Sequence, residues 1–209
     1  MNTEKIDHYI ENLKLCRALN RPEISLTLND DEIINTISNN AARAHDIMLE
    51  SNEFLSEIVF SKDPKTLTDD EIAYLQEFYG RLFDFAASLD TGIAYVVASR
   101  LLECARYRGD KPFIIRELYD TGIALHYMNS SGGGYLPNPL RERIVKYFIE
   151  GASYLDEYDS FDITTKKYIL RCLGNTKIDL PREGRETTAE YLRRFDHAMS
   201  IFTSEEYHR

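Results

Sequence analysis

Residues 164–202 read TTKKYILRCLGNTKIDLPREGRETTAEYLRRFDHAMSIF, and this stretch decides the fold that we expect for the whole chain. It predicts two amphipathic helices joined by the turn-forming segment DLPREG, because apolar residues recur every three or four positions on each side of that segment. These apolar residues are Tyr168, Ile169, Cys172 and Leu173 in the first helix and Tyr191, Leu192, Phe195, Ala198, Met199 and Phe202 in the second. One hairpin cannot bury both apolar faces by itself, so we expect other hairpins to stack against it.

The same periodicity predicts further helices in the preceding chain. They cover about residues 3–20, 30–58, 69–85, 91–107, 112–129 and 139–158. For the helix at 30–58, the inward stripe is expected to contain Ile34, Ile37, Ala41, Ala44, Met48, Leu55 and Ile58. Two helix starts, Thr68-x-x-Glu71 and Thr187-x-x-Glu190, have capping-box spacing, in which each side chain satisfies the other residue's backbone N–H.

No segment predicts a strand, so the expected fold class is all-α, with about eight helices as stacked antiparallel hairpins in a solenoid-like arrangement. The pentapeptide Asp-Thr-Gly-Ile-Ala occurs at 90–94 and again at 120–124, a spacing close to one helical hairpin. We expect a single all-helical domain over residues 1–209. It can be subdivided into acidic N-terminal helices at 1–67 and repeat-like hairpins at 68–209.

Charge is unevenly distributed along the 209 residues. Residues 1–90 hold 18 Asp and Glu against 8 Lys and Arg, a balance of −10, whereas residues 91–209 hold 17 of each, a balance of zero. Binding of a nucleic-acid backbone needs clustered positive charge, so we expect no nucleic-acid partner. The three cysteines are far apart and lack metal-ligand spacing, which predicts buried free thiols and no zinc site.

The chain contains no apolar run near the roughly 20 residues that span a bilayer. Its first residues, MNTEKIDHYIENL, are acidic and amphipathic and do not match a signal peptide. We therefore expect a cytoplasmic protein with no membrane partner. The ending SEEYHR carries no helix-stop signal, which favours a chain that continues beyond Arg209.

The terminal hairpin resembles a degenerate tetratricopeptide repeat. Leu173-Gly174 is similar to the Leu-Gly pair of that motif, and Phe195 and Ala198 are similar to its aromatic-x-x-Ala. The turn is about five residues longer than the motif's, and the opening Trp is absent. The resemblance implies that the first helix lines a concave groove, into which Tyr168, Arg171 and Asn175 would face.

The stretch YILRCLGNTKI also resembles the helical amino-terminal regulatory regions of bacterial diguanylate cyclases and related signalling proteins. This resemblance implies a sensor or docking domain in bacterial signalling. The chain contains no Gly-Gly-Asp-Glu-Phe motif, so no cyclase activity is expected from it.

Within the expected groove, Arg171 and Asn175 are i, i+4 neighbours that could together hold a carboxylate. Further groove candidates are His126 and Tyr127 in the helix at 112–129 and Arg100 and Arg106 in the helix at 91–107. The alternative interpretation is that these residues form ordinary polar helix faces. The loop SSGGGYLPNP at 130–139 lacks the Gly-Lys-Ser/Thr of a phosphate-binding loop and is expected to be a surface loop or a lid.

We therefore expect a non-catalytic interaction or regulatory domain without cofactors, which binds a peptide, a protein or a small ligand and can form a homodimer. An alternative is a metal-dependent phosphohydrolase that uses the His45-Asp46 pair, with His8 as an upstream ligand. The surrounding sequence AARAHDIMLES lacks the apolar run and the glycine that usually flank such a pair, and no later aspartate stands out as a closing ligand.

Overall fold

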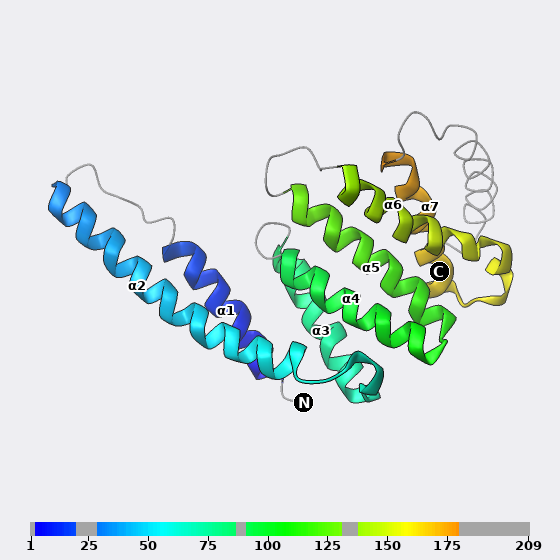
Figure 1. The fold of residues 1–209 in the computed structure, drawn as a ribbon, viewed down its shortest axis with the longest axis horizontal. Coiled ribbons are helices and arrows are strands. Elements are labelled where there is room, and N and C mark those ends of the chain that lie inside the picture. The colour runs from blue at the N-terminus through cyan, green and yellow to red at the C-terminus, as the bar shows by residue number, and fades with distance from the viewer. Residues whose placement is uncertain (1–2, 20–28, 87–90, 131–137, 180–209) are drawn as a thin grey trace. The chain divides into compact units, whose positions relative to one another are not determined.

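The computed structural model of the chain describes residues 3–19, 29–86, 91–130 and 138–179 (Figure 1). These residues form seven α-helices and no strand, which confirms the all-α prediction with one helix fewer than the expected eight. The helix expected at 187–202 and the Thr187–Glu190 capping box lie outside the described residues, as does most of the loop at 130–139. Within the described ranges, no helix combines the length and the apolar character needed to cross a membrane.

The chain divides into two compact units, Met1–Leu89 and Asp90–Arg209. The first unit contains α1 (Glu4–Leu19), α2 (Asp30–Leu55) and α3 (Asp69–Ala86). The second contains α4 (Thr91–Arg108), α5 (Lys111–Ser130), α6 (Asn138–Ser153) and α7 (Ile163–Asp179). The expected subdivision lay ahead of α3, whereas α3 belongs to the first unit.

In the first unit, both α2 and α3 begin with a capping box. The Glu32 N–H donates to Asn29 Oδ1 at 3.0 Å, and the Asn29 N–H donates to Glu32 Oε2 at 2.9 Å. At the start of α3, the Glu71 N–H donates to Thr68 Oγ1 at 3.3 Å and the Thr68 N–H donates to Glu71 Oε2 at 2.9 Å. The capping box predicted at Thr68 is therefore confirmed.

An aromatic cluster joins the three helices of the first unit. The ring of Tyr9 on α1 stacks on Phe54 of α2 at a centroid distance of 4.9 Å. Both rings meet Phe78 of α3 edge to face, at 5.4 Å and 5.6 Å. Such pairs add about 0.5–1.5 kcal/mol each beyond the apolar area that they bury. Because Phe78 is fully buried, it anchors the core of this unit.

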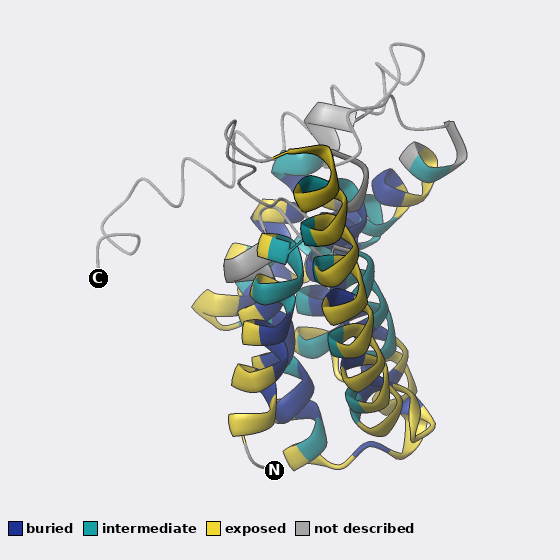
Figure 2. Ribbon diagram, turned by 90° about the vertical axis from the view of Figure 1, so that its left-hand side faces the viewer, coloured by how far each residue is buried: buried dark blue, intermediate teal, exposed yellow. Residues whose placement is uncertain are grey.

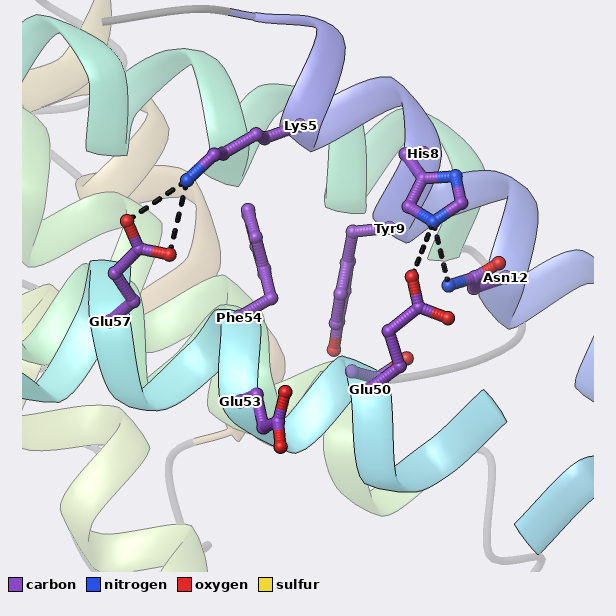
Figure 3. A pocket seen from close by; sticks show the side chains of 9 residues that line it. Lys5, His8, Tyr9, Asn12, Glu50, Glu53, Phe54 and Glu57 are labelled. Carbon is purple, nitrogen blue, oxygen red and sulfur yellow. Dashed lines mark hydrogen bonds and ion pairs between the residues drawn. The ribbon is translucent and has the colours of Figure 1, made fainter. Parts of the chain in front are cut away.

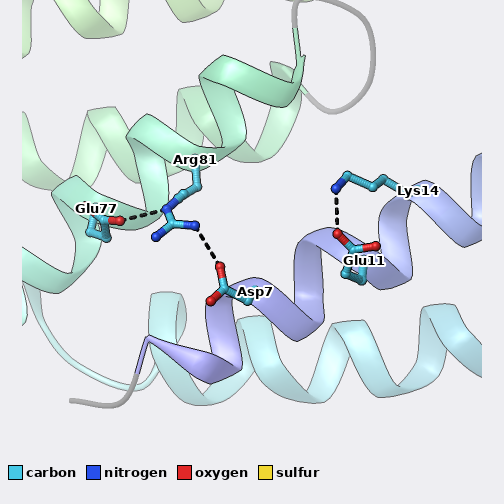
Figure 4. Close-up of polar contacts among 5 residues, drawn as sticks. All are labelled: Asp7, Glu11, Lys14, Glu77 and Arg81. Atoms are coloured by element: carbon cyan, nitrogen blue, oxygen red, sulfur yellow. Dashed lines mark hydrogen bonds and ion pairs between the residues drawn. The ribbon is translucent and has the colours of Figure 1, made fainter.

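A charged contact on the surface also joins α1 to α3 (Figure 4). The guanidinium of Arg81 donates from Nη1 to Asp7 Oδ1 on α1 and from Nε to Glu77 Oε1 on its own helix, each at 2.7 Å. These side chains are about half exposed, so solvent screens the attraction and its contribution to stability is small.

The expected inward stripe of α2 is only partly buried. Four of its members are exposed: Ile34, Ile37, Ala41 and Met48. The prediction that they face inward is wrong because α1 is shorter than α2 and covers only one side of it. Near the C-terminal end of α1, Cys16 Sγ donates to the carbonyl of Ala44, so the first turns of α2 extend beyond the described end of α1. One covering helix buries only a narrow stripe, which includes Ala44 and Leu55.

In the second unit each helix packs against the next, as expected for stacked antiparallel hairpins, and α5 contacts α4, α6 and α7. The turn between α4 and α5 depends on Gly109, whose φ of 68° is readily adopted only by glycine. Its N–H donates to the carbonyls of Ala105 and Arg106 at 3.0 Å and 3.2 Å, which satisfies the end of α4. Along the long helices, buried and exposed residues occupy opposite sides (Figure 2).

All three cysteines are free, as predicted. Cys104 and Cys172 are buried in the second unit, while Cys16 is only half buried. Burial raises the pKa of the Cys16 and Cys172 thiols. Their thiolate forms are therefore disfavoured, and both residues behave as small apolar side chains.

The close approach of α6 and α7 at Gly151 gives a prediction of stability. A Cβ placed at Gly151 on α6 would lie 2.5 Å from Sγ of Cys172 on α7. We expect Gly151→Ala to lower the free energy of unfolding, measured by urea denaturation, by about 1–3 kcal/mol, because the helices must move apart.

The matched control is Gly80→Ala on α3, where an added Cβ meets nothing within 4 Å. This change should stabilise the protein by about 0.5–1 kcal/mol, because alanine is the better helix former. In a Cys172→Ala background, Gly151→Ala should lower the free energy of unfolding by much less. An unchanged stability of Gly151→Ala in the wild-type background would contradict the close α6–α7 packing.

Candidate functional site

The second unit carries a cluster of charged and aromatic side chains where α5 packs against α7. We call it the α5–α7 cluster, and its members are Arg116, Glu117, Tyr119 and Asp120 on α5 and Tyr168 and Arg171 on α7. On α5, residues 116 and 120 are one helical turn apart, as are residues 168 and 171 on α7. One turn of α5 and one turn of α7 therefore supply the whole cluster.

Two tyrosine rings hold Arg171 at the surface of the cluster. Its guanidinium carbon lies 5.7 Å from the ring centroid of Tyr119 and 5.5 Å from that of Tyr168. The rings themselves are 5.6 Å apart and inclined by 60°. Both rings are half buried and Arg171 is exposed. Cation–π attraction thus restricts the arginine while its N–H groups make no hydrogen bond within the described part of the chain.

Beneath Arg171 lie two carboxyl groups that are almost fully buried. Glu117 is 1% exposed and Asp120 is 8% exposed. Nε of Arg116 lies 3.7 Å from Glu117 Oε1 and 3.6 Å from Asp120 Oδ2, so one arginine serves both carboxyl groups. Buried charges persist in proteins when they are paired in this way.

Burial raises the pKa of Asp120 to about 6, even though the positive charges of Arg116 and Arg171 act in the opposite direction. The same environment affects the tyrosines. The pKa of Tyr119 is raised, mainly by burial, and Tyr127 adds to the rise. The pKa of Tyr168 is raised by burial and then by the charge of Asp120. The phenols therefore stay neutral, and Asp120 changes charge near physiological pH.

The structure brings together two of the predicted groove residues, Tyr168 and Arg171. Asn175 lies one turn further along α7, and its Nδ2 donates to the carbonyl of Arg171 at 2.8 Å. One amide hydrogen of Asn175 is therefore used by the backbone of α7. Joint binding of a carboxylate by Arg171 and Asn175 stays a prediction.

The other predicted groove residues lie elsewhere on the second unit. His126 and Tyr127 adjoin each other near the end of α5, with ring centroids 5.7 Å apart. Arg106 on α4 donates from Nη2 to both carboxylate oxygens of Glu150 on α6, at 2.6 Å and 2.7 Å. Arg100 is half buried on α4. Arg106 therefore links two helices.

Sequence reasoning missed the α5 side of the cluster, namely Arg116, Glu117, Tyr119 and Asp120. A signal was present, because RELYD at 116–120 places three charged residues inside a helix that is otherwise apolar on most sides. Charged residues on a buried helix indicate a paired internal cluster. The partner helix α7, however, lies about 50 residues away in the sequence, so only the tertiary structure identifies it.

The His45-Asp46 pair does not meet further ligands. His45 Nδ1 lies 3.6 Å from Asp46 Oδ1, and both side chains are largely exposed on α2. His8, the expected upstream ligand, instead contacts Glu50 through Nε2 at 2.7 Å. Among the residues that the structure describes, no group of three or more His, Cys, Asp or Glu could hold a metal ion.

Comparisons with protein-family models, with curated proteins and with solved structures found no match for this chain. The resemblance to tetratricopeptide repeats and the resemblance to bacterial regulatory regions therefore stay predictions. A helical structure by itself does not distinguish these families from other all-α proteins.

The pKa of Asp120 gives a prediction about stability and pH. The folded protein holds this proton up to about pH 6, whereas an unfolded aspartate loses it near 3.8. The folded state binds more protons between these values, so the free energy of unfolding should fall as pH rises from 4 to 7. The loss attributable to Asp120 is at most about 3 kcal/mol.

Urea unfolding of the wild type and of Asp120→Asn across this range measures the effect. The stability of the variant relative to the wild type should rise with pH. The control is Asp162→Asn at the start of α7. There the Thr165 N–H donates to Asp162 and lowers the pKa of this carboxyl. The free energy of unfolding of Asp162→Asn relative to the wild type should therefore change little with pH above 5. If the stability of Asp120→Asn relative to the wild type did not change with pH, Asp120 would not be held protonated by burial.

Proposed function

We propose that this chain is a non-catalytic interaction and regulatory domain whose second unit binds a carboxylate on the α5–α7 cluster. The carboxylate belongs to a peptide, a protein segment or a small ligand. The observation that carries this proposal is the position of Arg171. Its guanidinium is exposed, lies over the rings of Tyr119 and Tyr168, and makes no ion pair with another described residue.

Preorganisation favours such a site. A free arginine side chain loses rotamer freedom when it binds a ligand, and the loss reduces affinity. Two tyrosine rings already restrict Arg171 in the unbound protein. The planar guanidinium can then offer two parallel N–H donors to a carboxylate, and the tyrosine rings supply apolar area beside it.

The buried charges beneath the surface leave Arg171 available. Arg116 lies within ion-pair distance of both Glu117 and Asp120, so these carboxylates have a cationic partner other than Arg171. Asp120 still acts on Arg171 through space, since the two charges influence each other. The site therefore combines an accessible arginine with a carboxyl group that titrates near pH 6.

The wider role rests on the two resemblances. In a tetratricopeptide-like register, Tyr168, Arg171 and Asn175 would face one groove, which agrees with a binding role for α7. The similarity of YILRCLGNTKI to regulatory regions of bacterial signalling proteins adds a sensory or docking role. The phosphohydrolase alternative has no comparable support, because His45 and Asp46 are exposed without a third ligand in the described part of the chain.

Paired peptides test the proposal. A library of short peptides is presented once with a free C-terminal carboxylate and once with a C-terminal amide, and binding to the purified full chain is measured by fluorescence polarisation. We expect a subset of the free-acid peptides to bind and their amides to bind at least about tenfold more weakly, the magnitude of a lost charge-assisted hydrogen-bond pair. Arg171→Ala should abolish that difference, and Asn175→Ala should reduce it.

Arg108→Ala removes an exposed arginine near the end of α4 and is the matched control for net charge. It should leave the preference for free acids unchanged. Circular dichroism melts of each variant show whether the fold is intact. Equal binding of acids and amides, or a preference that survives Arg171→Ala, would contradict the proposed site.

Binding should also depend on pH. Protonation of Asp120 below about pH 6 removes a negative charge near Arg171, so affinity for a peptide carboxylate should increase as pH falls from 7 to 5. The carboxylate of the ligand itself stays ionised in this range. In Asp120→Asn the affinity should be nearly independent of pH. The same titration by fluorescence polarisation distinguishes these outcomes.

A further inference from the structure

A pocket opens between α1 and α2 of the first unit (Figure 3). Its cavity volume is about 230 Å³, below the roughly 300 Å³ at which pockets for drug-sized ligands begin. An ion pair lies at each end. Lys5 Nζ lies 2.9 Å from Glu57 Oε1, and His8 Nε2 lies 2.7 Å from Glu50 Oε1. The pocket is therefore suited to a small ligand, and an ion pair closes each of its two ends.

Two aromatic rings lie between the ion pairs. Tyr9 of α1 and Phe54 of α2 both line the pocket and stack on each other with an interplanar angle of 26°. They belong to the aromatic cluster with the fully buried Phe78, so the core holds them in place. The middle of the pocket thus offers a rigid apolar wall, and aromatic faces also attract cations.

Glu53 adds a carboxylate to this wall that the fold does not use. Glu50, Glu53 and Glu57 are spaced i, i+3 and i+7 along α2, which places all three on one side of the helix. Glu50 and Glu57 have the ion pairs at the two ends. Glu53 lies between Glu57 and Glu50 along α2 in Figure 3 and is exposed, and its carboxylate makes no hydrogen bond or ion pair with any residue that the structure describes.

Ser51 provides an independent sign of a missing partner. It lines the same pocket and is only 7% exposed, and its Oγ has no hydrogen-bond partner in the described part of the chain. A buried hydroxyl without a partner carries a cost in free energy, and such groups usually mark an absent ligand or water.

We propose that this pocket binds a small organic cation, namely a primary alkylammonium with a short hydrocarbon chain. The ammonium pairs with the Glu53 carboxylate, and the hydrocarbon chain lies against Tyr9 and Phe54. The lining carries three carboxylates against Lys5 and His8, so its charge favours a cation over an anion.

A metal ion fits this lining less well than an organic cation. Hard divalent cations take six or more oxygen ligands at short range. Two of the three glutamates are already held by Lys5 and His8, and the stacked rings place apolar surface where further ligands would be needed. An alkylammonium needs one carboxylate and an apolar wall, and the pocket offers both. This site lies in the first unit and does not depend on the function proposed for the second.

The test is a titration of the ¹⁵N-labelled full chain with n-butylammonium, followed by amide chemical shifts in two-dimensional NMR. We expect saturable shifts at residues 50–57 and along the facing part of α1. Two probes of similar size are the ligand controls: neutral n-butanol and anionic butyrate should produce no saturable shifts there. Glu53→Gln should weaken n-butylammonium about tenfold, as expected when a charge-assisted hydrogen bond is lost.

Asp46→Asn removes the same charge from an exposed position on α2 outside the pocket and should leave the affinity unchanged. Ser51→Ala should leave the affinity unchanged, because n-butylammonium has no second polar group for the hydroxyl. The melting temperature of this variant should stay equal or rise, because the change removes a buried hydroxyl that has no partner. Equal affinity in Glu53→Gln and the wild type, binding of n-butanol as strong as that of the amine, or no saturation at all would each overturn the proposal.

Discussion

The burial of α5 is the constraint on which the second unit depends. Three helices cover it, and residues such as Ile115, Leu118 and Thr121 are completely inaccessible to solvent. A helix covered in this way can retain charged residues only if neighbouring groups pair with them. Arg116 meets that need for Glu117 and Asp120, and the geometry that results raises the pKa of Asp120 and places Tyr119 beside α7. The accessible position of Arg171 follows from this arrangement, because the tyrosine that holds it belongs to the buried helix.

Both candidate sites use aromatic rings to position charge. In the first unit, stacked rings on α1 and α2 separate two ion pairs and leave the Glu53 carboxylate free of described partners. In the second unit, two tyrosine rings support an arginine. The charges are opposite, in keeping with the acidic balance of residues 1–90 and the neutral balance of the remainder. The two proposals therefore assign ligands of opposite charge to the two units.

Periodicity predicted the α-helices of the described chain to within a few residues, and the capping box at Thr68 was found where its spacing indicated. It failed on α2. Ile34 and Ile37 have helical spacing, but no long described helix covers that end of α2, so they are exposed. Spacing shows which residues share a face of a helix and does not show whether another helix lies on that face. Ser51 shows the converse, since a polar residue in the last two turns of α2 is buried.

For the sites, the resemblance of Leu173-Gly174 to a tetratricopeptide repeat led us to predict Tyr168, Arg171 and Asn175 as groove residues, and their binding role stays a prediction. The sequence by itself determined the helical class, the free cysteines and the uneven charge, which are local or compositional properties. Only the tertiary structure decided that Tyr119 and Asp120 lie beside α7 and that Glu53 and Ser51 face a pocket against α1. These features depend on contacts between helices far apart in the chain. Such contacts are selected by the packing of whole faces, and no local pattern of residues encodes them.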